Sequence, residues 1–122
     1  MNQILVVDDD PVVSALVSAL LSRAGWRTTL LSNAQSALEH LERETCDVVI
    51  TDVNMPGMTG VQLLDRIRST ARLANLPVVL LTATRADTAI VPFDDKATLV
   101  LHKPVRPAAF AQEIRDWLQS LE

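Results

Sequence analysis

Four segments of this sequence end in side chains that could bind a metal ion or a phosphate group. The run VVDDDP at 6–11 supplies Asp8 and Asp9, and Asp52 follows the apolar run at 48–51. Thr82 and Lys103 follow two further apolar runs. Neighbouring carboxylates repel and raise each other's pKa, which a bound cation relieves. Mg²⁺ suits the set because it takes few protein carboxylates and keeps several waters, and Mn²⁺ is an acceptable substitute.

A carboxylate, a hydroxyl, an ammonium group and a metal ion together are suited to phosphoryl transfer onto a carboxylate. The metal and Lys103 would neutralise phosphoryl oxygens, Thr82 would position one of them, and an aspartate would attack. No single one of these residue types is specific, so the prediction depends on their meeting in space.

The elements that must bring them together alternate between strands and helices. Strands are predicted from mostly apolar runs at 4–7, 48–51, 78–81 and 98–101, and a further strand is predicted at 27–31. Helices are predicted between them and at about 107–121, from apolar residues at helical spacing. Strands that are apolar throughout indicate a parallel sheet with helices on both faces. Ligands bind beyond the carboxyl ends of such strands, where all five candidate side chains should converge.

Caps support this division into elements. Asp10 is predicted to be the N-cap of the first helix rather than a ligand, with Pro11 at the first helical position. Gly25 is a natural stop for that helix. Ser32 or Asn33 is predicted to cap the second helix.

Composition excludes several classes of protein. The 122 residues predict one domain, 1–122, and the net charge of −4 gives no basic face for nucleic acid. No apolar run approaches the roughly 20 residues of a membrane span. Cys46 is the only cysteine, which excludes an internal disulfide framework and fits a cytoplasmic location.

Taken together, the motifs resemble the receiver domain of two-component response regulators. The matching segments are VVDDDP at 6–11, TDVNMPGMTG at 51–60, LLTA at 80–83 and HKP at 102–104. The resemblance covers the whole chain. It implies a flavodoxin-like, doubly wound (βα)5 fold with parallel strand order 2-1-3-4-5.

The resemblance also implies roles for the acidic residues. Asp52 corresponds to the phosphoacceptor. Asp8 and Asp9 correspond to the pair that holds Mg²⁺, completed by Asp52 and the backbone carbonyl of Asn54. Sensor histidine kinases or histidine phosphotransfer proteins are the implied donors, and a protein effector is the implied target. No direct contact with nucleic acid or membrane is expected.

Four more positions match or depart from the family. Thr82 corresponds to the switch hydroxyl, and Lys103 to the lysine that pairs with the phosphoryl group. The Lys103–Pro104 bond is implied to be cis, and small Ala83 leaves phosphodonors room to enter. Val100 departs, because many family members carry Tyr or Phe there, whose ring rotates with the switch hydroxyl.

A second departure lies between the fourth and fifth strands. Pro92 follows Asp87 so closely that a helix starting there would break after little more than a turn. We therefore predict a fourth helix that is short, distorted or missing. Output is predicted to proceed through ordering of 84–97 or through the face of the first helix.

Two alternatives remain open at this point. A phosphatase of the haloacid-dehalogenase type would use Asp8 and Asp10 as its D-x-D pair, but it would leave Asp52 unexplained. A pseudo-receiver would bind partners without phosphorylation. In the preferred interpretation the chain is no enzyme beyond its own phosphorylation and dephosphorylation at Asp52. It would act alone or as the receiver of a longer chain.

Overall fold

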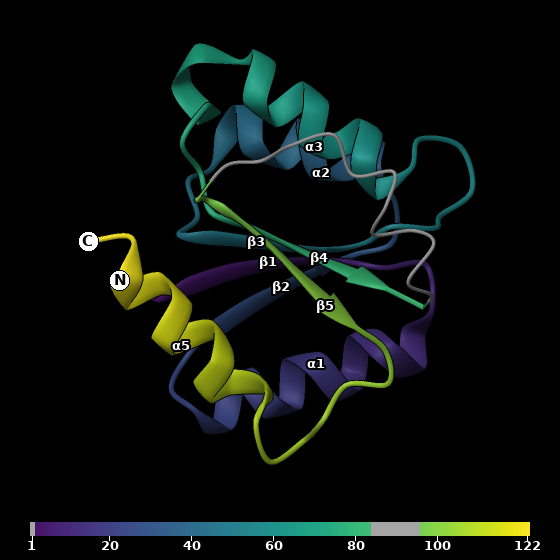
Figure 1. Cartoon of the computed structure of the whole chain (residues 1–122). Coiled ribbons are helices and arrows are strands. Elements are labelled where there is room, and N and C mark those ends of the chain that lie inside the picture. The colour runs from purple at the N-terminus through teal and green to yellow at the C-terminus, as the bar shows by residue number, and fades with distance from the viewer. Residues whose placement is uncertain (1, 84–95) are drawn as a thin grey trace.

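The computed structural model describes residues 2–83 and 96–122, and its centre is one five-stranded parallel sheet (Figure 1). The strand order β2-β1-β3-β4-β5 is the one that the resemblance implied, and the predicted doubly wound fold is confirmed. Register pairs Val7 with both Leu31 and Thr51, so the carboxyl ends of the central strands lie at one edge. The strands are β1 (Gln3–Val7), β2 (Arg27–Leu31), β3 (Val48–Asp52), β4 (Val78–Thr82) and β5 (Thr98–His102).

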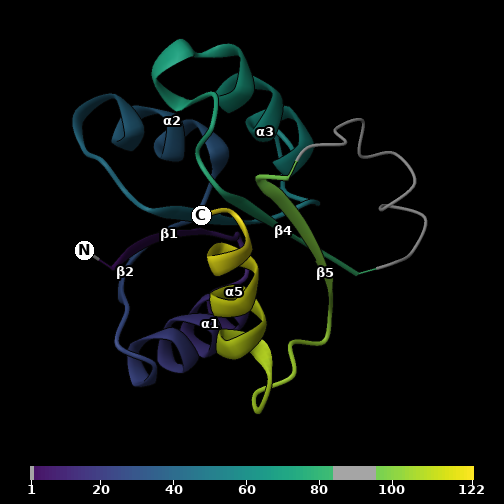
Figure 2. The ribbon, with the colours of Figure 1, turned by 60° about the vertical axis from the view of Figure 1, so that its left-hand side comes forward.

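Helices cover both faces of the sheet (Figure 2). On one face lie α1 (Pro11–Arg23) and α5 (Phe110–Ser120). On the other lie α2 (Ala34–Arg43) and α3 (Gly60–Ser69), with the 3₁₀ turn η1 (Ala71–Leu73) after α3. The prediction of an altered fourth helix falls on 84–95, which lie outside the described residues, and it stays a prediction.

Two aliphatic cores, one on each face, hold these layers together. Leu64 and Ile67 of α3 are fully buried on one face, and Val17 and Ile114 are fully buried on the other. The two edge strands are less buried than the three central strands. β2 and β5 are half exposed, because each pairs with a neighbour on one side only among the described strands.

The capping predictions for the first two helices are confirmed. The Asp10 side chain accepts a hydrogen bond from the Val12 amide at 2.9 Å, with Pro11 at the first position. Gly25, with φ at 96°, follows the end of α1, where a left-handed backbone favours glycine. Asn33 caps α2 by accepting from a backbone amide.

The last helix begins later than predicted. We expected it to start at about Pro107, but α5 begins at Phe110, after a turn. Its N-cap residue, Ala109, has no side-chain oxygen to accept the free amides of a first turn. Phe110 and Ile114 then bury the predicted apolar face against the sheet.

None of the described helices is long and apolar enough to cross a membrane.

Candidate acidic site at the sheet edge

The predicted acidic residues meet at the carboxyl edge of the sheet. Asp8 directly follows β1, and Asp52 is the last residue of β3, the strand that pairs with β1. One carboxylate oxygen from each of Asp8, Asp9 and Asp52 lies within 4.8 Å of the other two. Asp8 and Asp52 are buried, whereas Asp9 is exposed. The site is therefore an acidic pocket with one side open to solvent.

Asp8 is the most constrained carboxylate of the three. Its Oδ1 accepts a hydrogen bond from the Asp10 amide at 2.9 Å. Its Oδ2 is buried and has no hydrogen-bond partner in the described part of the chain. Burial raises the pKa of Asp8, and the negative charges of Asp52 and Asp9 raise it further. The Asp10 amide and the Lys103 ammonium act in the opposite direction.

Lys103 brings a positive charge into this cluster. Its Nζ lies 3.2 Å from Oδ1 of Asp52 and 3.6 Å from Oδ2 of Asp8. The backbone amide of Lys103 donates to the Thr82 carbonyl at 2.7 Å, which continues the β4–β5 pairing to the edge of the sheet. The Lys103–Pro104 peptide bond is cis, as the resemblance implied.

The donor set fits a hard divalent cation. It consists of carboxylate oxygens, and one ammonium group cannot balance three negative charges. The buried Oδ2 of Asp8 lacks the hydrogen bond that a buried carboxylate normally has, and its position within the cluster leaves it available as a ligand. The cluster could bind a metal ion, and its oxygens suit Mg²⁺ better than a softer metal.

The remaining predicted residues lie at the end of β4, in β5 and in the loop after β3. Thr82 ends β4 and is fully buried, and the next residue, Ala83, is exposed. Asn54, two residues beyond Asp52, is also exposed. Val100 lies inside β5, half-buried, and packs against the core on the α2/α3 face.

Gly60 is a site residue that the sequence analysis missed. It is the first residue of α3, and its amide donates to the Val53 carbonyl at 2.9 Å. A Cβ at this position would lie 2.1 Å from the Asp52 carbonyl oxygen, closer than any side chain can approach. Its signal in the sequence was its place at the end of TDVNMPGMTG at 51–60, a segment that the resemblance matched without giving this glycine a role. Gly60 lets α3 pack directly against the backbone of Asp52.

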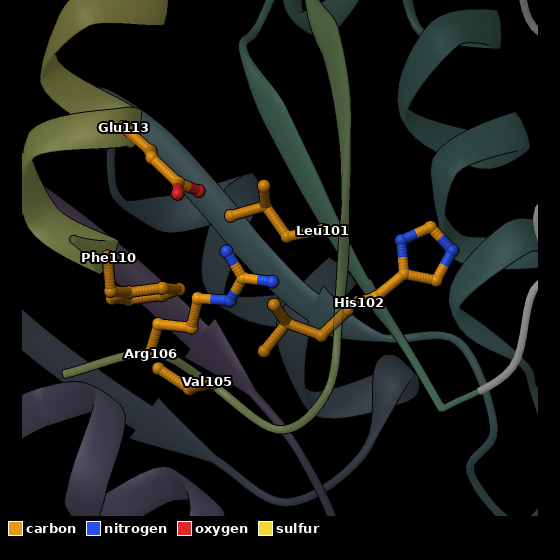
Figure 3. Close-up of a pocket in the computed structure, with 7 residues that line it drawn as sticks. Leu101, His102, Val105, Arg106, Phe110 and Glu113 are labelled. Carbon is orange, nitrogen blue, oxygen red and sulfur yellow. The ribbon is translucent and has the colours of Figure 1, made fainter.

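A small cavity lies beside the site without belonging to it. It measures about 180 Å³ between β5 and α5, and none of its lining residues is in the acidic cluster. Figure 3 shows Arg106, Phe110 and Glu113 among the side chains that line it. The His102 ring points away from the other labelled side chains, from the end of β5.

The comparisons with known proteins agree with this geometry. The family model described as "Response regulator receiver domain" matches residues 4–115. The two-component response regulator ORR5 of Oryza sativa subsp. japonica is 36% identical over 107 residues, which are 86% of this chain and 80% of that protein. Its counterpart ORR7 is 36% identical over 118 residues, 95% of this chain and 56% of that protein. The probable transcriptional regulatory protein TcrX of Mycobacterium tuberculosis is 42% identical over 83 residues, 68% of this chain and 35% of that protein.

Solved structures give the same result for the fold. The chemotaxis response regulator CheY4 of Vibrio cholerae superposes with a TM-score of 0.83 at 28% identity, covering 96% of this chain and 98% of that one. A signal receiver domain of a histidine kinase from Syntrophus aciditrophicus gives a TM-score of 0.86 at 25% identity, covering 100% and 93%. The chain thus spans nearly the whole of these structures, but only about half or less of ORR7 and TcrX. The fold, the acidic site and these matches together show that the chain belongs to the response regulator receiver domain family.

Proposed function

We propose that Asp52 accepts a phosphoryl group from a phosphohistidine of a sensor histidine kinase or a histidine phosphotransfer protein. The observation that carries this proposal is the position of the Lys103 ammonium, 3.2 Å from Oδ1 of Asp52 inside an acidic cluster. An ammonium beside a nucleophilic carboxylate is placed to receive a phosphoryl oxygen.

The proposed reaction uses groups that the chain already holds in place. An Asp52 oxygen attacks phosphorus, and a P–O bond forms while the P–N bond to the donor imidazole breaks. The imidazole leaves with the electron pair and takes up a proton. Lys103 moves its contact from the carboxylate to a phosphoryl oxygen, which keeps its charge paired throughout.

Asp8, Asp9 and Asp52, with the backbone carbonyl of Asn54, would hold Mg²⁺ at this site. When bound, the ion supplies positive charge that neutralises phosphoryl oxygens. The role of Asp8 would be to present Oδ2, which accepts no hydrogen bond in the described part of the chain, in a fixed orientation, because its other oxygen is held by the Asp10 amide. Asp9 would supply its carboxylate from the side that is open to solvent.

The change of conformation on phosphorylation would begin at the end of β4. The Thr82 hydroxyl would turn toward the phosphoryl group, and Ala83 would leave room for the donor. Val100 has no ring to rotate, so the aromatic rearrangement that many family members use cannot occur at this position. A different part of the surface would then change on phosphorylation, and a protein effector would bind the changed surface. The domain that does this is 1–122, since the family match already spans residues 4–115.

The test is intact mass after incubation with Mg²⁺ and acetyl phosphate. We expect one phosphoryl adduct, which is absent in Asp52→Asn and retained in the matched control Asp65→Asn. Asp65 is an exposed carboxylate on α3, outside the acidic cluster. An adduct that persists in Asp52→Asn would refute the assignment.

The same samples separate the alternatives. Steady hydrolysis of phosphate esters that survives Asp52→Asn but requires Asp8 would indicate a phosphatase. No adduct in any variant, from either acetyl phosphate or a phosphorylated histidine phosphotransfer protein, would indicate a pseudo-receiver.

A further inference from the structure

Helix α1 has an outer face without charge along most of its length. Its sequence from Pro11 to Ser22 contains no charged residue, and Arg23 ends the helix. Val12 is 75% exposed and Leu16 is 40% exposed. An exposed helix normally carries charged residues on the side facing solvent, and a helix that is apolar all round is normally covered. We call the stripe Val12, Leu16, Ala19 and Arg23 the α1 outer face.

The other sides of α1 already have partners within the chain. Val17 and Leu21 are buried against the sheet. Toward β2, the Ser18 hydroxyl shares a 2.6 Å hydrogen bond with that of Thr28. α5 lies beside α1 on the same face of the sheet, and the two helices together form the layer there (Figure 2). The α1 outer face is therefore the side left for a partner outside the chain.

The two ends of this face carry opposite charges. Asp10 precedes α1 and is exposed, and one of its oxygens caps the helix. Arg23 is exposed at the other end and pairs with no acidic group that the structure describes. The two lie thirteen residues apart, about 20 Å along a helix. An uncharged stripe with one acidic and one basic end is complementary to its own copy in the antiparallel orientation.

We propose that the α1 outer face is a self-association surface, on which α1 of a second copy packs antiparallel across a two-fold axis. Leu16 of each copy then lies near the axis, because it is close to the midpoint between Asp10 and Arg23. Val12 packs beside Ala19 of the second copy, whose small side chain allows close approach. Arg23 of each copy reaches Asp10 of the other. This inference does not depend on phosphorylation of Asp52.

Such a contact buries less surface than a permanent dimer. Interfaces below about 1,200 Å² are typical of weak, transient complexes, so association in the micromolar range or weaker is expected. The first turn of α1 directly follows Asp8 and Asp9, so the second copy would lie beside the open side of the acidic site. A bulky phosphodonor protein would then compete with the second copy.

Sedimentation equilibrium on the full chain tests the proposal across protein concentrations up to the millimolar range. We expect a reversible monomer–dimer equilibrium. Leu16→Glu places two like charges at the axis and should weaken it by about tenfold or more. Arg23→Glu should weaken dimerisation less than Leu16→Glu does. Its effect on dimerisation should be larger at low salt than at high salt, because salt screens exposed charges. Circular dichroism checks that each variant is folded.

Leu30→Glu is the matched control. Leu30 is 45% exposed, but it belongs to the edge strand β2 and not to the α1 outer face. It should leave the dimer unchanged. The proposal is overturned if the chain stays monomeric at all concentrations, or if a dimer survives Leu16→Glu. It is overturned equally if Leu16→Glu impairs only phosphotransfer from a histidine phosphotransfer protein, because the face would then serve that partner instead.

Discussion

Asp8 gives the sharpest test of the electrostatics, because it is a buried carboxylate crowded by two others. It is 3% exposed, its Oδ2 accepts no hydrogen bond in the described part of the chain, and two other carboxylates lie beside it. Asp8→Asn removes the charge while keeping the shape. Its Oδ1 can still accept from the Asp10 amide. Without divalent cations, we expect this substitution to stabilise the fold.

The magnitude follows from the distances. At an effective dielectric constant of about 20, two unit charges 4.8 Å apart interact by about 3.5 kcal/mol, and two charges 3.6 Å apart by about 4.6 kcal/mol. The repulsion between Asp52 and Asp8 is therefore about 3.5 kcal/mol or more, and the attraction between Lys103 and Asp8 is about 4.6 kcal/mol. Asp9 adds a repulsion that solvent screens, because it is exposed. These charges nearly balance, so desolvation decides the sign, and Asp8→Asn should gain about 1 to 2 kcal/mol.

Urea unfolding in EDTA and again in Mg²⁺ measures both effects. Asp8→Asn should be more stable than the unmodified chain in EDTA and should gain nothing from Mg²⁺. The unmodified chain should gain about 1.4 kcal/mol when free Mg²⁺ is ten times its dissociation constant. Asp9→Asn is the matched control, because it changes an exposed carboxylate of the same cluster: it should lose the Mg²⁺ response without gaining stability in EDTA.

The pH dependence has a definite sign. The pKa of Asp8 is raised above its ordinary 3.8, so the folded state holds that proton to higher pH than the unfolded state does. Its contribution therefore lowers stability as pH rises through the interval between those two pKa values. The advantage of Asp8→Asn should be complete above that interval and vanish below it. An Asp8→Asn variant less stable than the unmodified chain in EDTA at neutral pH would refute the reasoning.

Three further predictions concern other parts of the fold. Gly60→Ala should lower the free energy of unfolding by about 2 kcal/mol or more, because its Cβ would overlap the Asp52 carbonyl; Gly57→Ala, with φ at 77° and open space around it, should cost only about 1 kcal/mol. Arg68→Met should lower it by about 2 to 3 kcal/mol, because the guanidinium donates to backbone carbonyls just before β4 and β5; an unchanged urea midpoint would contradict this. Burial raises the pKa of Cys46 to about 11, so iodoacetamide should alkylate the folded chain about 100-fold more slowly than the unfolded chain at neutral pH.

The strands could be predicted because β1, β3 and β4 are buried on both faces and are therefore apolar. Hydropathy placed the ends of β3 and β4 one residue early, since their last residues, Asp52 and Thr82, are polar. Backbone pairing continues through both. The order of the strands could not be obtained from periodicity, because periodicity shows which residues of a strand are apolar but not which strand lies beside it. It came from the resemblance.

The part of the site that lies at the ends of strands could be predicted from the sequence. Asp8 and Asp52 had to meet once β1 and β3 were parallel neighbours, and Lys103 followed from the pairing of β4 with β5. Gly60 could not be found this way, because its role depends on how closely α3 approaches the backbone of β3. The start of α5 was misplaced because Pro107 is a good first helical residue only where a capping side chain precedes it.

The run of three aspartates connects the acidic site to the proposed self-association surface. Asp8 belongs to the site, Asp10 caps α1, and the Asp10 amide donates to Oδ1 of Asp8 at 2.9 Å. The Ser14 hydroxyl, one turn into α1, also donates to the Asp8 carbonyl at 3.5 Å. A change of charge around Asp8 therefore acts on the groups that orient the first turn of α1. If Mg²⁺ alters the dimer constant by some factor, dimerisation must alter Mg²⁺ affinity by the same factor. Measuring both constants determines whether these features are coupled, and equal constants with and without Mg²⁺ would show that they act independently.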